Sequence, residues 1–180
     1  LPAGSRNVPY TQTLTPDAGT DPFTFSESGV LPSGITFTSS TTDATLSGMT
    51  AELGIFPISI SVTDSNGCTG TILDTLIISC PAITISPPTL PDGLRGIPYS
   101  QALSANGGTA PYSFATAGGS LPAGFNLSPT GNIGETASDS GTFSFTVKVT
   151  DSHGCTATQA FTIRINLPTI SGSVWGDRNG

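Results

Sequence analysis

The sequence predicts an all-β protein made of two tandem immunoglobulin-like antiparallel β-sandwich modules arranged end to end. Three observations support this prediction. The sequence repeats itself after roughly 90 residues. Apolar and polar residues alternate with the period of two that is typical of strands. Turn-forming residues, with 22 Gly and 15 Pro, separate these short runs.

The repeat consists of several motifs that return in the same order. Because the offset between matching motifs varies only between 87 and 90 residues, small loop changes explain the difference between the copies. Residues 1–10 return as 90–99, residues 21–25 as 110–114, residues 31–34 as 121–124, and residues 62–69 as 149–156.

Each copy contains one clear hairpin. Phe143, Phe145, Val147 and Val149 alternate with polar residues, and Phe56, Ile58, Ile60 and Val62 do the same in the first copy. One face of each strand should therefore enter a core. The β-branched runs 71–79 and 160–165 follow, and we expect Gly67 and Gly154 to take the positive-φ position of the intervening turns.

About seven short strands per copy, separated by such turns, favour the immunoglobulin-type sandwich. A single intertwined all-β domain is the alternative, and the clean repeat disfavours it. The predicted organisation has residues 1–80 as a module lacking its first strand, because residues 81–89 precede the second copy and nothing precedes the first. Residues 81–168 form the second module, and residues 169–180 form a tail or the start of a further β-domain.

Composition excludes several classes of function. The 180 residues hold 5 Lys+Arg against 12 Asp+Glu, for a net charge of −7, so the clustered cations that bind nucleic acid are absent. No apolar stretch approaches the roughly 18 residues that span a bilayer. A single His, a single Lys and 3 Cys offer little for a catalytic site or a zinc site. We therefore expect no enzyme, no catalytic residues and no membrane insertion.

The ordered motifs also carry a family resemblance. The run Leu-Pro-x-Gly-x-x-Gly-x-Pro-Tyr-Ser-Gln, followed by Gly-Gly-Thr-x-Pro-Tyr, Leu-Pro-x-Gly and Thr-Asp-x-x-Gly-Cys-Thr, resembles the bacterial putative immunoglobulin-like (cadherin-like) tandem repeat family. The resemblance covers residues 1 to 168. It implies β-sandwich repeats of large secreted or surface proteins, used as spacers or adhesive stalks, with no catalytic residues to transfer.

The last residues, 170–180, resemble the start of a B-type repeat of bacterial surface adhesins. That resemblance implies calcium ligation by Asp177 and Asn179. Asp64 and Asp151, at the two hairpin tips, are further calcium candidates. Each tip supplies one Asp, whereas calcium takes about six to eight oxygens, so capping of the turn is the favoured role of these two residues. No other cofactor is expected.

The three cysteines lead to a specific prediction. Cys68 and Cys80 lie at opposite ends of one strand, roughly 40 Å apart, too far for a disulfide. In this sandwich the hairpin tip lies at the end where the chain enters, and the last strand leaves at the other end. We therefore predict an interdomain disulfide between Cys80 and Cys155. Cys68 is then unpaired or joined to another module or subunit. The alternative is that all three cysteines are reduced and pack as small apolar side chains.

These features predict an extracellular structural or interaction protein: a rigid spacer, stalk or adhesin segment of a bacterial surface or secreted protein. A more specific form of this prediction is head-to-tail polymerisation by strand donation. It rests on residues 167–175, which begin with a sequence similar to that of residues 80–85. Expected partners are neighbouring modules or copies of the same protein, with polysaccharide or a cell surface as further candidates. The alternative is a carbohydrate- or calcium-binding accessory module of a secreted multidomain protein.

Overall fold

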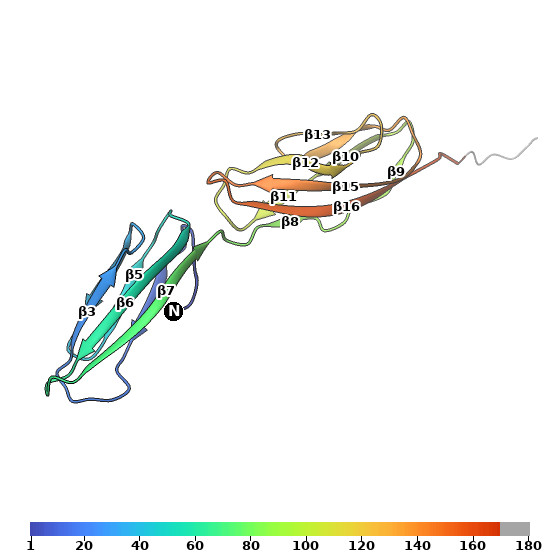
Figure 1. Ribbon diagram of the computed structural model, residues 1–180. Coiled ribbons are helices and arrows are strands. Elements are labelled where there is room, and N and C mark those ends of the chain that lie inside the picture. The colour runs from blue at the N-terminus through green and yellow to red at the C-terminus, as the bar shows by residue number, and fades with distance from the viewer. Residues whose placement is uncertain (170–180) are drawn as a thin grey trace, which may run out of the picture. The chain divides into compact units, whose positions relative to one another are not determined.

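The computed structural model describes residues 1–169, and every regular element in this part of the chain is a strand (Figure 1). The chain divides into two compact units after Pro81. Unit 1 is Leu1–Pro81, and unit 2 starts at Ala82. The all-β prediction and the prediction of two tandem sandwich modules are confirmed. In the described residues, no helix could serve as a membrane span.

Unit 1 is a sandwich of two sheets. One sheet has the strand order β1-β7-β6-β3 and the other has the order β2-β5-β4. All neighbours are antiparallel except β1 and β7, which are parallel. The strands are β1 (Gly4–Ser5), β2 (Tyr10–Leu14), β3 (Thr24–Gly29), β4 (Ile35–Ser39), β5 (Ala44–Gly48), β6 (Gly54–Thr63) and β7 (Thr69–Ser79).

Unit 2 repeats this arrangement and adds one strand pair. Its sheets have the orders β12-β15-β16-β9 and β10-β14-β13, and β8 pairs with β11. The short strand β9 lies parallel to β16, as β1 does to β7. The strands are β8 (Thr84–Ser86), β9 (Gly93–Leu94), β10 (Pro98–Ala102), β11 (Ser104–Asn106), β12 (Ser113–Gly119), β13 (Asn126–Leu127), β14 (Asn132–Thr136), β15 (Gly141–Thr150) and β16 (Thr156–Asn166).

Both predicted hairpins are confirmed. Strand β6 pairs with β7, and β15 pairs with β16. The second strand of each hairpin starts earlier in the sequence than expected, at Thr69 and at Thr156. Its pairing with the first strand begins directly beside the turn. Gly67 and Gly154 take φ values of 82° and 84° in these turns. A side chain at this φ would be strained, so glycine is the residue that the turn needs.

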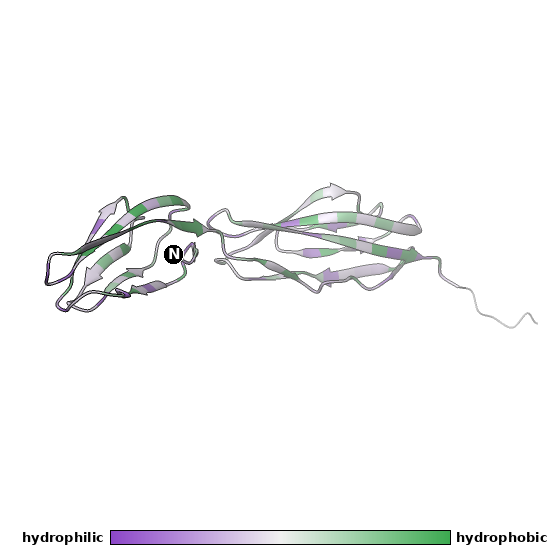
Figure 2. Cartoon of the chain, turned by 60° about the horizontal axis from the view of Figure 1, so that its bottom comes forward, coloured by the Kyte–Doolittle hydropathy of each residue, from purple (hydrophilic) through white to green (hydrophobic). Residues whose placement is uncertain are grey.

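Alternating residues of these strands build the two cores, and Figure 2 shows the corresponding change of hydropathy along the strands. In unit 2, Val147 and Val149 are fully buried, and Phe145 stacks on Phe161 with ring centroids 5.9 Å apart. The core of unit 1 has fewer buried residues: Tyr10, Ile35, Leu46, Ile58, Ile60, Leu76 and Ile78.

The difference between the cores follows from strand β8. Its residue Ile85 and the preceding Ile83 are 6% and 9% exposed and belong to the core of unit 2. Within the described residues, unit 1 has no counterpart of β8. Residues 15–17, which correspond to β11 in the repeat, form no strand in unit 1.

Candidate functional site

The three cysteines occupy different environments. Cys80 and Cys155 are both disulfide-bonded, whereas Cys68 carries a free, exposed thiol. Cys155 follows the turn between β15 and β16 and is 1% exposed, and Cys80 directly follows β7. The bond predicted between Cys80 and Cys155 stays a prediction at this point, as does the expected partner of Cys68.

Each hairpin tip is organised by one aspartate. The Oδ1 of Asp151 accepts hydrogen bonds from the backbone N–H groups of His153, at 2.9 Å, and Cys155, at 2.8 Å. Its Oδ2 accepts the N–H of Thr109 at 3.0 Å. The tip of unit 2 is therefore fixed to the loop before β12.

Asp64 makes the equivalent bonds in unit 1. Its Oδ1 accepts the N–H groups of Asn66, at 2.9 Å, and Cys68, at 2.8 Å. Its Oδ2 accepts the N–H of Thr20 at 3.2 Å. The same carboxylate thus caps the same turn in both copies, as expected for a turn-forming aspartate.

These hydrogen bonds set the acidity of both aspartates. The N–H of Cys68 makes the largest contribution in lowering the pKa of Asp64 below its ordinary value of 3.8. For Asp151, burial raises the pKa, but the N–H groups of Thr109, Cys155 and His153 outweigh burial and lower the pKa. Both groups are therefore carboxylates at neutral pH, held by N–H donors.

The calcium assignments stay predictions. Asp64 and Asp151 each face backbone N–H donors instead of the several oxygens that calcium requires. Across residues 1–169, no group of three or more His, Cys, Asp or Glu side chains is placed to hold a metal ion. Asp177 and Asn179 lie outside the described residues.

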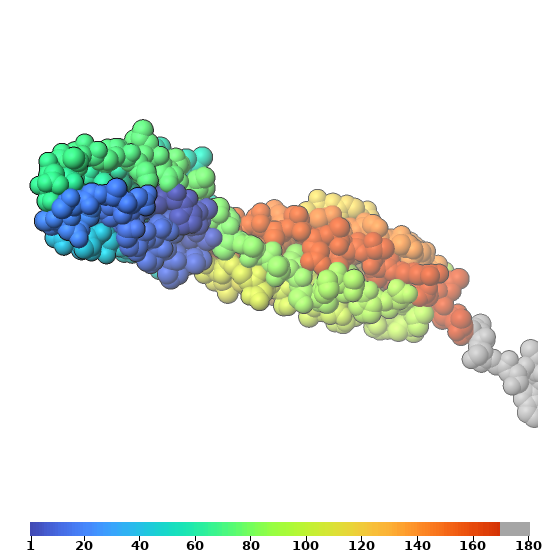
Figure 3. Space-filling model, turned by 90° about the horizontal axis from the view of Figure 1, so that it is seen from below, coloured from blue at the N-terminus to red at the C-terminus, as the bar shows by residue number. Residues whose placement is uncertain are grey.

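One side of unit 1 is hollowed. Two adjoining hollows, of about 340 and 210 Å³, share Pro16, Asp17, Val62 and Gly70 in their walls. In Figure 3 the blue residues of the segment after β2 lie beside the green residues of β7 on this unit. We call the combined feature the open groove; its other lining residues include Leu14, Phe25, Ile60, Ile72, Asp64 and Cys68.

Equivalent residues show what the open groove exposes. Val149 is fully buried in unit 2, whereas Val62, its counterpart in the repeat, is half-buried. Cys155 is 1% exposed, whereas its counterpart Cys68 is exposed. This groove was not predicted from the sequence.

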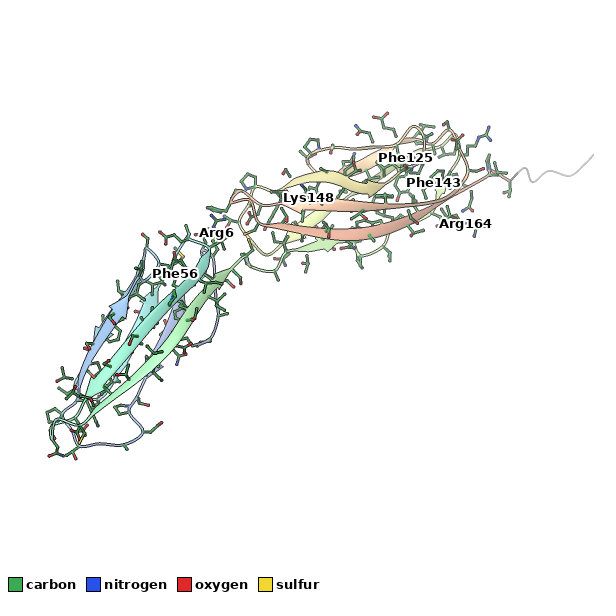
Figure 4. The ribbon with its side chains drawn as sticks, in the orientation of Figure 1. Arg6, Phe56, Phe125, Phe143, Lys148 and Arg164 are labelled. Atoms are coloured by element: carbon green, nitrogen blue, oxygen red, sulfur yellow. The ribbon has the colours of Figure 1, made fainter. Side chains whose placement is uncertain are left out.

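The outer faces of the two hairpins also differ. In unit 1, the cross-strand pair Ile55 and Ile77 is 70% and 45% exposed. In unit 2, the same positions hold Thr142 and Arg164, which is labelled in Figure 4. Lys148 is exposed on the same strand as Thr142. The outer face of unit 1 is therefore apolar where that of unit 2 is polar.

Comparison with known sequences finds a family match over nearly the whole described chain. The family model with the description "Putative Ig domain" matches residues 1–79 and again residues 81–166. No curated protein matches the chain.

Several solved structures have a similar arrangement of strands. A putative alpha-galactosidase/melibiase from Bacteroides fragilis is 25% identical over 47% of this chain and 17% of its own, with a TM-score of 0.41. An endo-fucoidan hydrolase of glycoside hydrolase family 107 is 21% identical over 91% and 32%, with a TM-score of 0.40. Cadherin domains 1–4 of Protocadherin Gamma B7 are 14% identical over 92% and 49%, with a TM-score of 0.43. The chain thus spans less than half the length of each.

Proposed function

The chain belongs to the Putative Ig domain family, and from this membership we propose that it is a structural segment of an extracellular bacterial protein: a spacer, stalk or adhesin segment. The two family copies account for residues 1–79 and 81–166. A sandwich of this kind provides stiffness and surface, and its function depends on what is attached to it.

The disulfide state of the cysteines is the observation that supports this proposal best. Cys80 and Cys155 are both oxidised, and disulfides persist outside the cytoplasm. The bond that we propose joins Cys80, after the last strand of unit 1, to Cys155 in the last hairpin of unit 2. Such a bond restricts rotation about the connection between the modules, as a spacer requires.

Peptide mapping by mass spectrometry without reduction tests this bond. After alkylation of free thiols and proteolysis, we expect one linked peptide pair that contains Cys80 and Cys155, and alkylated Cys68. Small-angle scattering with and without reductant then measures the stiffness. We expect a broader distribution of dimensions after reduction; an unchanged distribution contradicts the spacer role of the bond.

We further propose that copies of the chain join head to tail by strand donation. The likeness of residues 167–171 to residues 80–84 supports this form, since an extended segment can add a strand to the edge of a sheet. The donor would be residues 167–175, which continue beyond the described part of the chain. Deletion of residues 167–180 should abolish polymers in sedimentation experiments, and survival of polymers contradicts strand donation by this tail.

A further inference from the structure

The outer face of the larger sheet in unit 1 carries only uncharged side chains. Its outward residues alternate with the core positions of β3, β6 and β7. They are Thr24, Ser26 and Ser28 on β3, Ile55, Pro57, Ser59, Ser61 and Thr63 on β6, and Thr69, Thr71, Leu73, Thr75, Ile77 and Ser79 on β7. Depletion of charged side chains is typical of the core of a protein–protein interface.

Four of these residues form an apolar stripe, which we define as Ile55, Pro57, Leu73 and Ile77. Ile55 lies opposite Ile77 in the ladder between β6 and β7, and the two side chains are 70% and 45% exposed. Leu73 lies opposite Ser59 on the same two strands and is 83% exposed. An exposed apolar cluster of this kind marks a surface for association.

The second copy does not carry this stripe. The counterparts in unit 2 are Thr142, Ser144, Ala160 and Arg164, and Lys148 adds a second charge to the same face (Figure 4). Because both copies form the same hairpin, the fold does not require the apolar residues of unit 1. Their presence therefore indicates a role at the surface of the molecule.

The exposure of this face does not depend on the segment that precedes a copy. In unit 2, residues 81–92 come before β9, yet Thr142, Ala160 and Arg164 are all exposed. A preceding segment thus leaves the outer face of the sheet open.

The apolar stripe lies beside a shallow hollow. The hollow has a volume of about 470 Å³, and its lining includes Ser28, Gly29 and Ser59 next to Leu73. The first three residues have small side chains or none, so Leu73 projects beside a depression on the same face. A projection and a depression on one face are complementary to each other when two copies meet about a two-fold axis.

We propose that two copies of this chain associate face to face through the apolar stripe of unit 1, with Leu73 of each copy in the hollow of the other. Strands β3, β6 and β7 have 6, 10 and 11 residues. At about 3.3 Å per residue and about 4.8 Å between strands, they form a face of roughly 400 Å². Side chains roughen this face and enlarge its accessible area, so two copies bury about 1,000 Å² in total, near the lower limit of a specific interface. The area therefore fits a weak, reversible dimer.

Sedimentation equilibrium of the full chain between about 5 and about 500 μM tests for this dimer. Cys68 is alkylated first, so that a disulfide between two exposed thiols cannot produce the dimer. We expect a monomer–dimer equilibrium with a dissociation constant on the order of 100 μM. A monomer at every concentration overturns the proposal and would leave a different protein as the partner of the stripe.

The dependence on salt tests the nature of the contact. Each copy has a net charge of −7, whereas the outer face itself is uncharged, so the two copies repel each other most at low ionic strength. We expect the dissociation constant to fall about threefold between about 20 and about 300 mM NaCl, because salt screens the repulsion. Weaker association at the higher concentration would show that opposite charges hold the dimer, and it overturns the apolar interface.

The second copy supplies the variant that tests the face. Ile55→Thr with Ile77→Arg gives unit 1 the cross-strand pair that unit 2 has at these positions, so the fold tolerates the change. The new arginines repel each other across the two-fold axis, and we expect the dissociation constant to rise at least about tenfold.

Ile97→Arg is the matched control, because it adds the same charge at a 51% exposed side chain in the loop after β9. Its effect on the dissociation constant should stay within about twofold. Leu73→Ala introduces the alanine of unit 2 and leaves the hollow unfilled, so we expect about fivefold weaker association. Far-ultraviolet circular dichroism shows whether each variant is folded.

The outcomes separate this inference from the proposed head-to-tail joining, on which it does not depend. Equal dissociation constants for the double variant and for Ile97→Arg overturn the face. Deletion of residues 167–180 should leave the dimer unchanged. Association that is lost with residues 167–180 and is insensitive to the double variant supports strand donation and overturns the face-to-face dimer.

Discussion

Glu135 holds a backbone conformation that unit 1 gives to a glycine. Its φ is 101°, and it lies opposite Tyr99 in the ladder between β10 and β14. In unit 1 the residue opposite Tyr10 is Gly48, whose φ is 140°. Because a side chain at positive φ crowds the backbone, the repeat itself identifies a strained residue in unit 2.

We therefore predict that Glu135→Gly stabilises unit 2 by about 1 kcal/mol. The measurement is the urea concentration at the midpoint of unfolding of unit 2, followed by far-ultraviolet circular dichroism. Glu135→Ala is the control, because it removes the exposed carboxylate but keeps the Cβ atom. A gain of the same size for Glu135→Ala would show that charge, and not the backbone, limits stability at this position.

Asp151 determines a second residue-scale effect, the response of unit 2 to acid. Its folded-state pKa lies below the ordinary value of 3.8, so the unfolded chain binds the proton more tightly than the folded one. The contribution of Asp151 is complete above pH 4 and is lost as the pH falls through the lowered pKa. We expect stability to decline with pH below about 4.

The variant Asp151→Asn should reduce this decline and cost about 1 kcal/mol at neutral pH, because a neutral amide accepts weaker hydrogen bonds from the tip. Chemical denaturation between pH 2 and 7 measures both quantities. Asp139→Asn is the control at an exposed position on the same unit. If both variants give the same pH profile, the carboxylate of Asp151 does not cause the acid response.

At the scale of elements, the sequence predicted some strands and missed others for physical reasons. The long hairpins β6–β7 and β15–β16 were predictable, since local alternation and a glycine turn specify them. The parallel strands β1 and β9 have two residues each and pair with partners more than 70 residues away. Such short pairings between distant residues leave no periodic pattern in the sequence. The open groove was unpredictable for the same reason, because its walls come from segments that are far apart in the sequence.

Strand β8 carries the prediction at this scale. Ile85 is 6% exposed in the core of unit 2, so Ile85→Ala should destabilise this unit by about 2–4 kcal/mol. The neighbouring Thr84→Ala, on the exposed face, should change stability by less than about 0.5 kcal/mol. Guanidinium titration measures both. Similar costs for the two variants would mean that β8 contributes through backbone pairing alone, and not through its inward side chains.

At the scale of the whole molecule, the two copies share a fold but differ in their cores and in the state of their hairpin cysteines. Unit 2 has a β8 strand and a core that includes Cys155. Unit 1 has the open groove and an exposed Cys68. The positions of the cysteines in the repeat led to the prediction of a bond between Cys80 and Cys155, which stays a prediction. The sequence did not predict that the free thiol lies in the wall of a groove.

The proposed bond between Cys80 and Cys155 has an unequal effect on the two units. It closes a loop of about 75 residues that consists almost entirely of unit 2, which on the loop-entropy relation is worth about 4 kcal/mol. Reduction should therefore lower the melting temperature of unit 2 and leave that of unit 1 nearly unchanged. Calorimetry of the unmodified chain with and without reductant measures this difference.

Two variants show whether the bond causes that effect. The double variant Cys80→Ser with Cys155→Ser should melt like the reduced chain, and reductant should not change its melting temperature further. Cys68→Ser should respond to reductant as the unmodified chain does, because its thiol is free. A shift confined to unit 1 would contradict the proposed pairing, since a bond that closes unit 2 cannot stabilise unit 1 alone.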